Sequence, residues 1–232
     1  FFRDTVNAAN PNKHAGMIYA SNLCHEIAQN VGFTNLAEEI INEDGTITTK
    51  TNTGDMVTCN LNSISLGRIT DEELEENIAL QIRMLDNVIS INQAPVPESR
   101  MTSDKYRAIG LGTSGYHHYL VNHDIQWESD EHIEVADKLF ENIAFYAIKA
   151  SMELAKEKGA YPAFKGSEWE TGEYFTRRGY TSDRWKQLAA DVAKYGIRNG
   201  YLMAVAPTGS TSNIANTTAG IDPIFKKFFI EE

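Results

Sequence analysis

Short apolar runs alternate in this chain with longer stretches in which apolar residues recur every three to four positions, and this alternation limits the possible folds most strongly. The longest periodic stretch predicts a helix over residues 129–158, ended by Gly159, because glycine commonly terminates helices. A second helix is predicted from a cap at Thr70 to just before Pro95. Its apolar stripe consists of Leu74, Ile78, Ile82, Leu85 and Ile89.

The remaining segments complete an alternating pattern. Four β-prone runs predict strands, at residues 17–20, 56–66, 106–111 and 201–206. Two shorter helices are predicted at 113–121 and 183–195, and turns or loops at 42–45, 48–55 and 161–169. Strands that alternate with helices indicate an α/β fold, and no linker or repeat divides the 232 residues.

Charge and cysteine content exclude several classes of protein. A net charge of −11 and a pI near 5.0 argue against binding to nucleic acid or to an anionic membrane surface. We expect no membrane helix, since no apolar run is long enough, and no signal peptide, since the chain begins Phe-Phe-Arg-Asp. The two cysteines are too few for a disulfide scaffold, so a reducing, cytoplasmic location is expected.

The first motif that could carry chemistry surrounds Cys24. Asn22, Cys24 and Glu26 occupy alternate positions of an expected loop, and in an extended stretch alternate side chains point to the same side. One ligand could then contact an amide, a thiol and a carboxylate. The alternative is a buried cysteine that acts as a small hydrophobic residue, which the polar neighbours make less attractive because they would need partners.

A second motif is rich in hydroxyl groups and follows the last predicted strand. Its backbone N–H groups and hydroxyls could bind a phosphate, especially if residues 213–215 open a helix. The alternative is a solvated turn that only caps a helix, and the pattern alone does not decide between the two. The motif comprises Pro207, Thr208, Gly209, Ser210, Thr211 and Ser212, and is called the hydroxyl loop below.

Two further patterns are interpreted as structural. Residues 110–115 fit G-x-G-x-x-G, but the acidic strand end expected about twenty residues later is replaced by an apparent helix start at 127–130. Close packing of a strand on a helix is the preferred role for these glycines. His117 and His118 point in different directions from a helix and lack a third ligand, so no metal site is predicted.

Three motifs together resemble, in the same order, signatures of ribonucleotide reductase catalytic subunits. They are Ser-Asn-Leu-Cys-x-Glu-Ile at 21–27, Cys-Asn-Leu-Asn-Ser-Ile at 59–64 and Ala-Pro-Thr-Gly-Ser-Thr-Ser at 206–212. Shorter matches lie at 4–7, 10–11, 107–112, 161–164, 196–199 and 220–223, so the resemblance covers essentially the whole chain.

The resemblance implies a fold and a reaction. The fold would be a ten-stranded α/β barrel, of which residues 1–232 form a single segment, incomplete at both ends, with Cys24 on a central finger loop. Cys24 would become a thiyl radical and remove the 3′-hydrogen of a ribonucleotide, while Glu26 takes the 3′-hydroxyl proton and Asn22 binds the substrate hydroxyls. Cys59 would be one of two cysteines that supply electrons, and the hydroxyl loop would hold the substrate phosphate.

The resemblance also implies partners. This segment would bind no cofactor of its own and would need the remainder of the catalytic subunit, where the second reducing cysteine lies. The radical would come from outside, from a metal-containing small subunit by preference or from adenosylcobalamin, and thioredoxin or glutaredoxin would restore the thiols. Alone, the segment should not turn over. The stretch between Cys24 and Cys59 is longer than the family pattern, with 44–55 as the expected insertion.

Two other functions remain open on the residues alone. Cys24 could be the nucleophile of a hydrolase or transferase, with His25 or another histidine as its base. The chain could instead be a non-catalytic nucleotide-binding module that uses only the hydroxyl loop. A covalent acyl intermediate would indicate the first, and full activity after Cys24→Ser would indicate the second.

Overall fold

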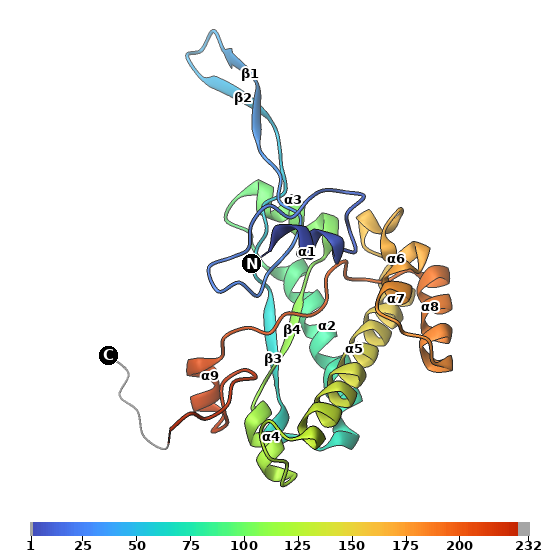
Figure 1. Ribbon diagram of the computed structural model, residues 1–232. Helices are drawn as coiled ribbons and strands as arrows, with labels where there is room; N and C mark the ends of the chain where they lie inside the picture. Colours follow the sequence, from blue (N-terminus) through green and yellow to red (C-terminus); the bar gives the residue numbers. More distant parts are fainter. Residues whose placement is uncertain (1, 227–232) are drawn as a thin grey trace.

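Two long helices form the centre of the molecule. A computed structural model describes residues 2–226, and in it α2 (Leu74–Ile91) and α5 (Asp130–Lys158) pack against each other along their lengths (Figure 1). The apolar stripe predicted for α2 is buried, which confirms that helix. The prediction for α5 is also confirmed: the Ser129 hydroxyl accepts the His132 N–H at its start, and Gly159 follows its last residue with a φ of +84°.

A short parallel sheet packs beside α2. Strands β3 (Leu61–Ser65) and β4 (Gly110–Ser114) pair in register from Leu61 opposite Gly110 to Ser65 opposite Ser114. On the other side of β4, the Leu111 N–H donates to the Leu202 carbonyl at 2.8 Å, and the Ala204 N–H donates to the Leu111 carbonyl at 3.1 Å. The strand predicted at 201–206 is therefore a single bridge to β4 rather than a regular strand.

Several predicted boundaries are wrong. Residues 17–20 form no strand, because they find only one backbone partner, the Val31 N–H that donates to the Met17 carbonyl. Only the last part of 56–66 is a strand. Tyr106 ends a helix that was not predicted, α3 (Pro97–Tyr106), which starts at a proline and stops where Arg107 adopts a φ of 44°.

The remaining helices are short, apart from the helix predicted at 183–195, which the structure confirms. Trp169 and Trp185 are buried where α6 (Glu168–Thr171), α7 (Glu173–Arg177) and α8 (Asp183–Tyr195) gather at one end of α5 (Figure 1). The loop predicted at 161–169 contains a 3₁₀ turn and the start of α6. These elements are α1 (Arg3–Ala8), α4 (Tyr116–Asn122), α6 (Glu168–Thr171), α7 (Glu173–Arg177), α8 (Asp183–Tyr195), α9 (Gly209–Ile214) and 3₁₀ turns at Leu66–Arg68, Asp71–Glu73 and Pro162–Phe164.

An antiparallel hairpin projects away from this body (Figure 1). It consists of β1 (Asn35–Ile41) and β2 (Ile47–Asn52), and every residue in both strands is exposed. The turn predicted at 42–45 is confirmed, with Gly45 at a φ of +83°. The loop predicted at 48–55 is wrong over its first half, because residues 48–52 pair with β1.

The α/β composition is confirmed, but the described residues do not form a closed barrel. They contain two separate two-stranded sheets. A barrel closes only when each strand is paired on both sides, whereas β3 pairs only with β4 and leaves an open edge. With no surrounding wall, the turn that carries Cys24 lies at the surface, and its neighbour Leu23 is 94% exposed. No helix within residues 2–226 combines the length and apolar character needed to cross a membrane.

A buried ion cluster joins α2 to the segments around β4 and α5. The Asp86 side chain is fully buried and accepts a hydrogen bond from Arg107 Nε at 2.7 Å. Arg198 Nε lies 3.2 Å and Lys158 Nζ 3.3 Å from its carboxylate oxygens. The Asn199 side chain, also buried, donates to the Arg107 carbonyl at 2.8 Å. The cluster therefore fixes the start of β4 relative to the segment that leads to the hydroxyl loop.

Candidate active site

The cysteine motif forms a tight turn. The His25 N–H donates to the Asn22 carbonyl at 3.1 Å, and His25 adopts a φ of 65°. The Ile27 N–H donates to Asn22 Oδ1 at 3.0 Å, and the buried Ile27 side chain anchors the end of the turn. The expectation of an extended loop is therefore wrong, and alternation does not place Asn22, Cys24 and Glu26 on one side.

Asparagine side chains hold both flanks of this turn. Asn7 donates to the Ile18 carbonyl at 2.8 Å and accepts the Ile18 N–H at 2.9 Å, which fixes the residues before the turn. After it, Asn30 accepts from Asn10 Nδ2 at 2.7 Å, and the Asn30 N–H donates to the Tyr201 hydroxyl. The motif residues 4–7 and 10–11 thus act in part by positioning the cysteine turn.

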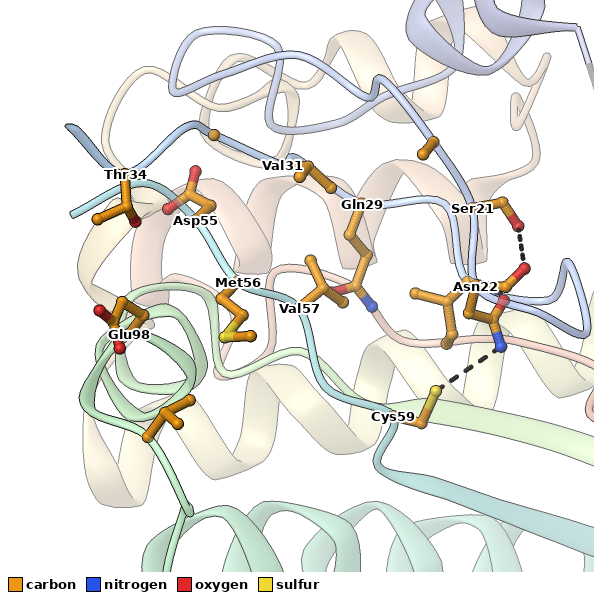
Figure 2. Close-up of a pocket in the computed structure, with 14 residues that line it drawn as sticks. Ser21, Asn22, Gln29, Val31, Thr34, Asp55, Met56, Val57, Cys59 and Glu98 are labelled. Atoms are coloured by element: carbon orange, nitrogen blue, oxygen red, sulfur yellow. Dashed lines mark hydrogen bonds between the residues drawn. The ribbon is translucent and has the colours of Figure 1, made fainter.

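The structure brings Asn22 and Cys59 into contact. Asn22 Nδ2 donates to Cys59 Sγ at 3.7 Å, and Figure 2 shows the amide directed at the sulfur. Although the Cys59 side chain reaches the surface, partial burial raises the pKa of its thiol, and the charge of Glu26 raises it further. The Asn22 hydrogen bond opposes this rise, and the charge of Cys24 adds a smaller increase to the Cys59 pKa. All four residues therefore lie near one another.

The Glu26 carboxylate has an oxygen in need of a partner. Oε2 is buried and receives no hydrogen bond from any group among residues 2–226. A buried carboxylate oxygen without a donor is unfavourable unless a ligand or water supplies one. The Glu26 carboxylate can therefore accept a proton from a hydroxyl group of a ligand.

A cavity of about 580 Å³ extends from the Asn22–Cys59 contact (Figure 2). It runs past Gln29 and Met56 to the base of the hairpin, while Cys24 and Glu26 lie outside its lining. Asp55 in its wall accepts hydrogen bonds from the Tyr106 hydroxyl at 2.9 Å and from Lys105 Nζ at 2.8 Å. Asp55 ends a stretch predicted as a turn, and no local pattern indicates that it faces a cavity.

The hydroxyl loop is the start of a helix. Helix α9 begins at Gly209, four residues before the position expected from the sequence. Thr208 and Ser212 are buried and use their hydroxyls internally: Thr208 Oγ1 accepts the Gly220 N–H at 2.7 Å, and Ser212 Oγ donates to the Gly209 carbonyl at 3.0 Å. Pro207, Gly209, Ser210 and Thr211 are exposed.

The exposed part of this loop has the chemistry to bind an anion. The first N–H groups of a helix have no acceptor within the helix, and they point outward at its start. Figure 1 places α9 on the side of β3 and β4 away from α5. Cys59 lies just before β3. Helix α9, by contrast, is tied to the turn that follows β3, where Arg68 Nη2 donates to the Asn216 carbonyl at 2.6 Å.

The glycines at 110–115 serve close packing. A Cβ atom on Gly112 would lie 2.3 Å from the Ala204 carbonyl oxygen, so glycine allows residues 201–206 to approach β4. Gly115, at a φ of +71°, precedes α4. The nearest neighbours of Gly112 and Gly115 are thus residues 201–206, Thr217 and Gly67, rather than the helix that the sequence analysis expected. Within the described part of the chain, no three His, Cys, Asp or Glu side chains are grouped to bind a metal.

Comparisons with known proteins agree with the motifs. The family described as "Ribonucleotide reductase, barrel domain" matches residues 1–232. The ribonucleoside-diphosphate reductase subunit alpha of Treponema pallidum is 55% identical over 238 residues, covering all of this chain and 28% of the relative. The subunits of the same name from Helicobacter pylori J99 and from Synechocystis are 37% and 35% identical, and this chain again aligns in full, with 36% and 28% of their lengths.

This chain thus spans about a third or less of those three relatives. Since the family match extends over every residue, the chain belongs to the ribonucleotide reductase barrel-domain family.

Proposed function

We propose that this chain is part of the catalytic subunit of a ribonucleotide reductase and that Cys24 is the residue that carries the radical. The proximity of Asn22, Glu26 and Cys59 supports this assignment, and the unpartnered oxygen of Glu26 is the observation that carries it. In the complete subunit, β3 and β4 would belong to a ten-stranded barrel closed around the Cys24 turn.

The proposed reaction assigns one task to each residue. The Cys24 thiyl radical takes the 3′-hydrogen atom of the nucleotide, and Glu26 accepts the 3′-hydroxyl proton as a general base. Asn22 hydrogen-bonds the substrate hydroxyls. The 2′-hydroxyl leaves as water, and the two electrons required come from Cys59 and a second cysteine, which form a disulfide. Cys24 recovers its hydrogen atom at the end of the cycle.

Binding and partners complete the proposal. The hydroxyl loop holds the substrate phosphates through backbone N–H groups and the Ser210 hydroxyl, which suits a chain of net charge −11 because no cation is needed. The names of the relatives favour a ribonucleoside diphosphate as substrate. A separate metal-containing subunit is the preferred radical source, with adenosylcobalamin as the alternative. Thioredoxin or glutaredoxin restores the thiols in a reducing cytoplasm.

A nucleophilic role for Cys24 has no structural support. Such a cysteine needs a base within hydrogen-bond distance, and in the described chain no histidine is hydrogen-bonded to Cys24. His25 follows it in a turn with a positive φ.

The test uses the full-length protein with its radical source. Cys24→Ser should abolish deoxyribonucleotide formation and leave nucleotide affinity nearly unchanged. Glu26→Gln should lower kcat by about 10²- to 10⁴-fold, the usual contribution of a general base. His25→Asn is the matched control, since asparagine tolerates a positive φ, and it should retain activity. Product formation by Cys24→Ser would exclude the proposed role.

A further inference from the structure

The hydroxyl loop is closed by the chain that follows α9. The Thr217 N–H donates to the Ser212 carbonyl at 3.0 Å, and the Gly220 N–H donates to Thr208 Oγ1 at 2.7 Å. Both bonds end on the two buried residues of the loop. Residues 216–220, called the return segment here, therefore determine where the exposed N–H groups of Gly209, Ser210 and Thr211 lie.

The turn between β4 and α4 holds this return segment. The Gly115 N–H donates to the Thr218 carbonyl at 2.7 Å. His118 contacts the segment twice: its Nδ1 lies 2.9 Å from Thr217 Oγ1, and its backbone N–H donates to Thr218 Oγ1 at 3.3 Å. The His118 side chain thus contacts Thr217, the residue whose N–H closes the hydroxyl loop on Ser212.

The surroundings of His118 leave its ring little freedom. A Cβ atom on Gly67 would lie 2.4 Å from the imidazole, so the ring packs directly on the backbone of the turn after β3. A Cβ atom on Gly115 would lie 2.4 Å from Thr217 Oγ1, so Thr217 is also held against backbone. The imidazole therefore fills the space between the end of β3 and the return segment.

The other end of the return segment is fixed independently. Asn216 adopts a φ of 50°, a conformation that asparagine tolerates better than most residues. Its carbonyl accepts a hydrogen bond from Arg68 Nη2 at 2.6 Å. The segment is thus held at the Asn216 carbonyl by the Arg68 side chain and at the Thr217 hydroxyl by the His118 side chain. Only the second contact depends on a histidine.

We propose that His118 is a positioning residue for phosphate binding and acts through Thr217 on the hydroxyl loop. This inference rests on the proposed function, because it assumes that the loop holds the substrate phosphates. Misplacing a group in a substrate site by about 1 Å can cost as much as 100-fold in rate. Removing the His118–Thr217 bond leaves Asn216 and Thr218 held by their own contacts but releases Thr217, whose N–H closes the hydroxyl loop on Ser212, and the loop then shifts relative to the rest of the site.

The experiment measures binding of a ribonucleoside diphosphate and of the same ribonucleoside without phosphate to the full-length protein. His118→Phe and Thr217→Val each remove the bond while preserving much of the side-chain volume. Each should weaken diphosphate binding about tenfold or more, leave nucleoside binding within about twofold, and raise KM by far more than it lowers kcat. The double variant should be no weaker than the single variants, since both break one bond.

Two further variants provide rescue and control. His118→Asn should restore most of the affinity, because its amide places a polar atom where Nδ1 stands. His123→Phe should bind like the wild type, since the His123 ring bonds to the Tyr119 carbonyl in its own helix. If His118→Phe fails to fold, the conservative variants Thr217→Val and His118→Asn decide the question.

Ser210→Glu separates this inference from the function beneath it. A carboxylate in the exposed loop should repel a diphosphate. If this variant binds the diphosphate normally, the loop is not the phosphate site and the proposed binding mode is wrong. If Ser210→Glu weakens binding while Thr217→Val and His118→Phe do not, the phosphate site stands and the role of His118 is refuted. Equal losses of diphosphate and nucleoside binding in the His118 and Thr217 variants would also refute it.

Discussion

Replacing Asp86 with asparagine should strongly destabilise the core of this chain. The substitution keeps the shape of the side chain but removes the one negative charge that faces Arg107, Arg198 and Lys158. The Arg107 side chain is itself buried, and arginine does not lose its proton in a folded protein. Asparagine therefore leaves a buried cation without a counter-charge.

The magnitude follows from the burial of this pair. Removing one partner of a buried ion pair costs about 3–5 kcal/mol, a large share of the roughly 5–15 kcal/mol that stabilises a typical domain. Amides of α2 and α5 that exchange through opening of this core should then exchange about 10²- to 10⁴-fold faster. The exposed pair Arg83–Glu157 joins the same two helices, with side chains 46% and 51% exposed.

Hydrogen exchange in the full-length protein measures the effect, with Glu157→Gln as the matched control. This control makes the same change of acid to amide but should alter stability far less, because water screens an exposed pair. If Asp86→Asn and Glu157→Gln alter the opening free energy by similar amounts, the reasoning from burial is refuted.

The same charge gives a pH dependence with a defined sign. Burial alone would raise the pKa of Asp86, but the hydrogen bond and charge of Arg107, with the charge of Arg198, outweigh it and hold the pKa below its usual value. A group with a lowered folded pKa stabilises the protein above its unfolded pKa, about 3.9, and this contribution is lost as the pH falls through the folded value. The difference between wild type and Asp86→Asn should therefore shrink in acid.

Two other predictions concern the site. Gly112→Ala should lower the free energy of unfolding by about 1–3 kcal/mol or more and weaken nucleotide binding, because its Cβ would meet the Ala204 backbone. The Cβ of Gly110→Ala would meet side-chain atoms, so this variant should lose less stability. Calorimetry and nucleotide titration compare the two variants. Alkylation of Cys59, followed by mass spectrometry, should show a midpoint above the ordinary value of about 8.5, and Asn22→Ala should raise it further by removing the N–H donor. A Cys59 alkylation midpoint at the ordinary value in the wild type would contradict the expected rise of the Cys59 pKa.

The two long helices could be predicted from this sequence because their signals are local. The stripe of α2, the cap at Ser129 and the stop at Gly159 each lie within a few residues of what they control. Strands depend on distant partners, which periodicity does not contain. Residues 201–206 have a suitable composition, yet only Met203 bridges to β4. Residues 48–52 look like a turn because they are polar, and they become β2 because β1 pairs with them.

The candidate site shows the same division. The residue types around Cys24 suggested a ligand site, but the expected extended loop is a turn, since the Asn22 carbonyl accepts the His25 N–H. That Asn22 meets Cys59, 37 residues away, could not come from local pattern; the family resemblance assigned the two residues to one reaction but did not predict this contact. No local signal in the sequence indicates the contacts of Asp55 and His118, because these contacts are with segments that folding brings to them.

One turnover in the absence of external reductant tests the central claim most directly. Full-length protein with its radical source and one equivalent of ribonucleoside diphosphate is quenched, and both the nucleotide and the oxidation state of Cys59 are read by mass spectrometry. We expect the wild type to form about one deoxyribonucleotide per disulfide that contains Cys59, and Cys24→Ser to form neither. Deoxyribonucleotide produced by Cys24→Ser, or produced by the wild type while Cys59 stays a free thiol, would contradict the assignment of these two cysteines.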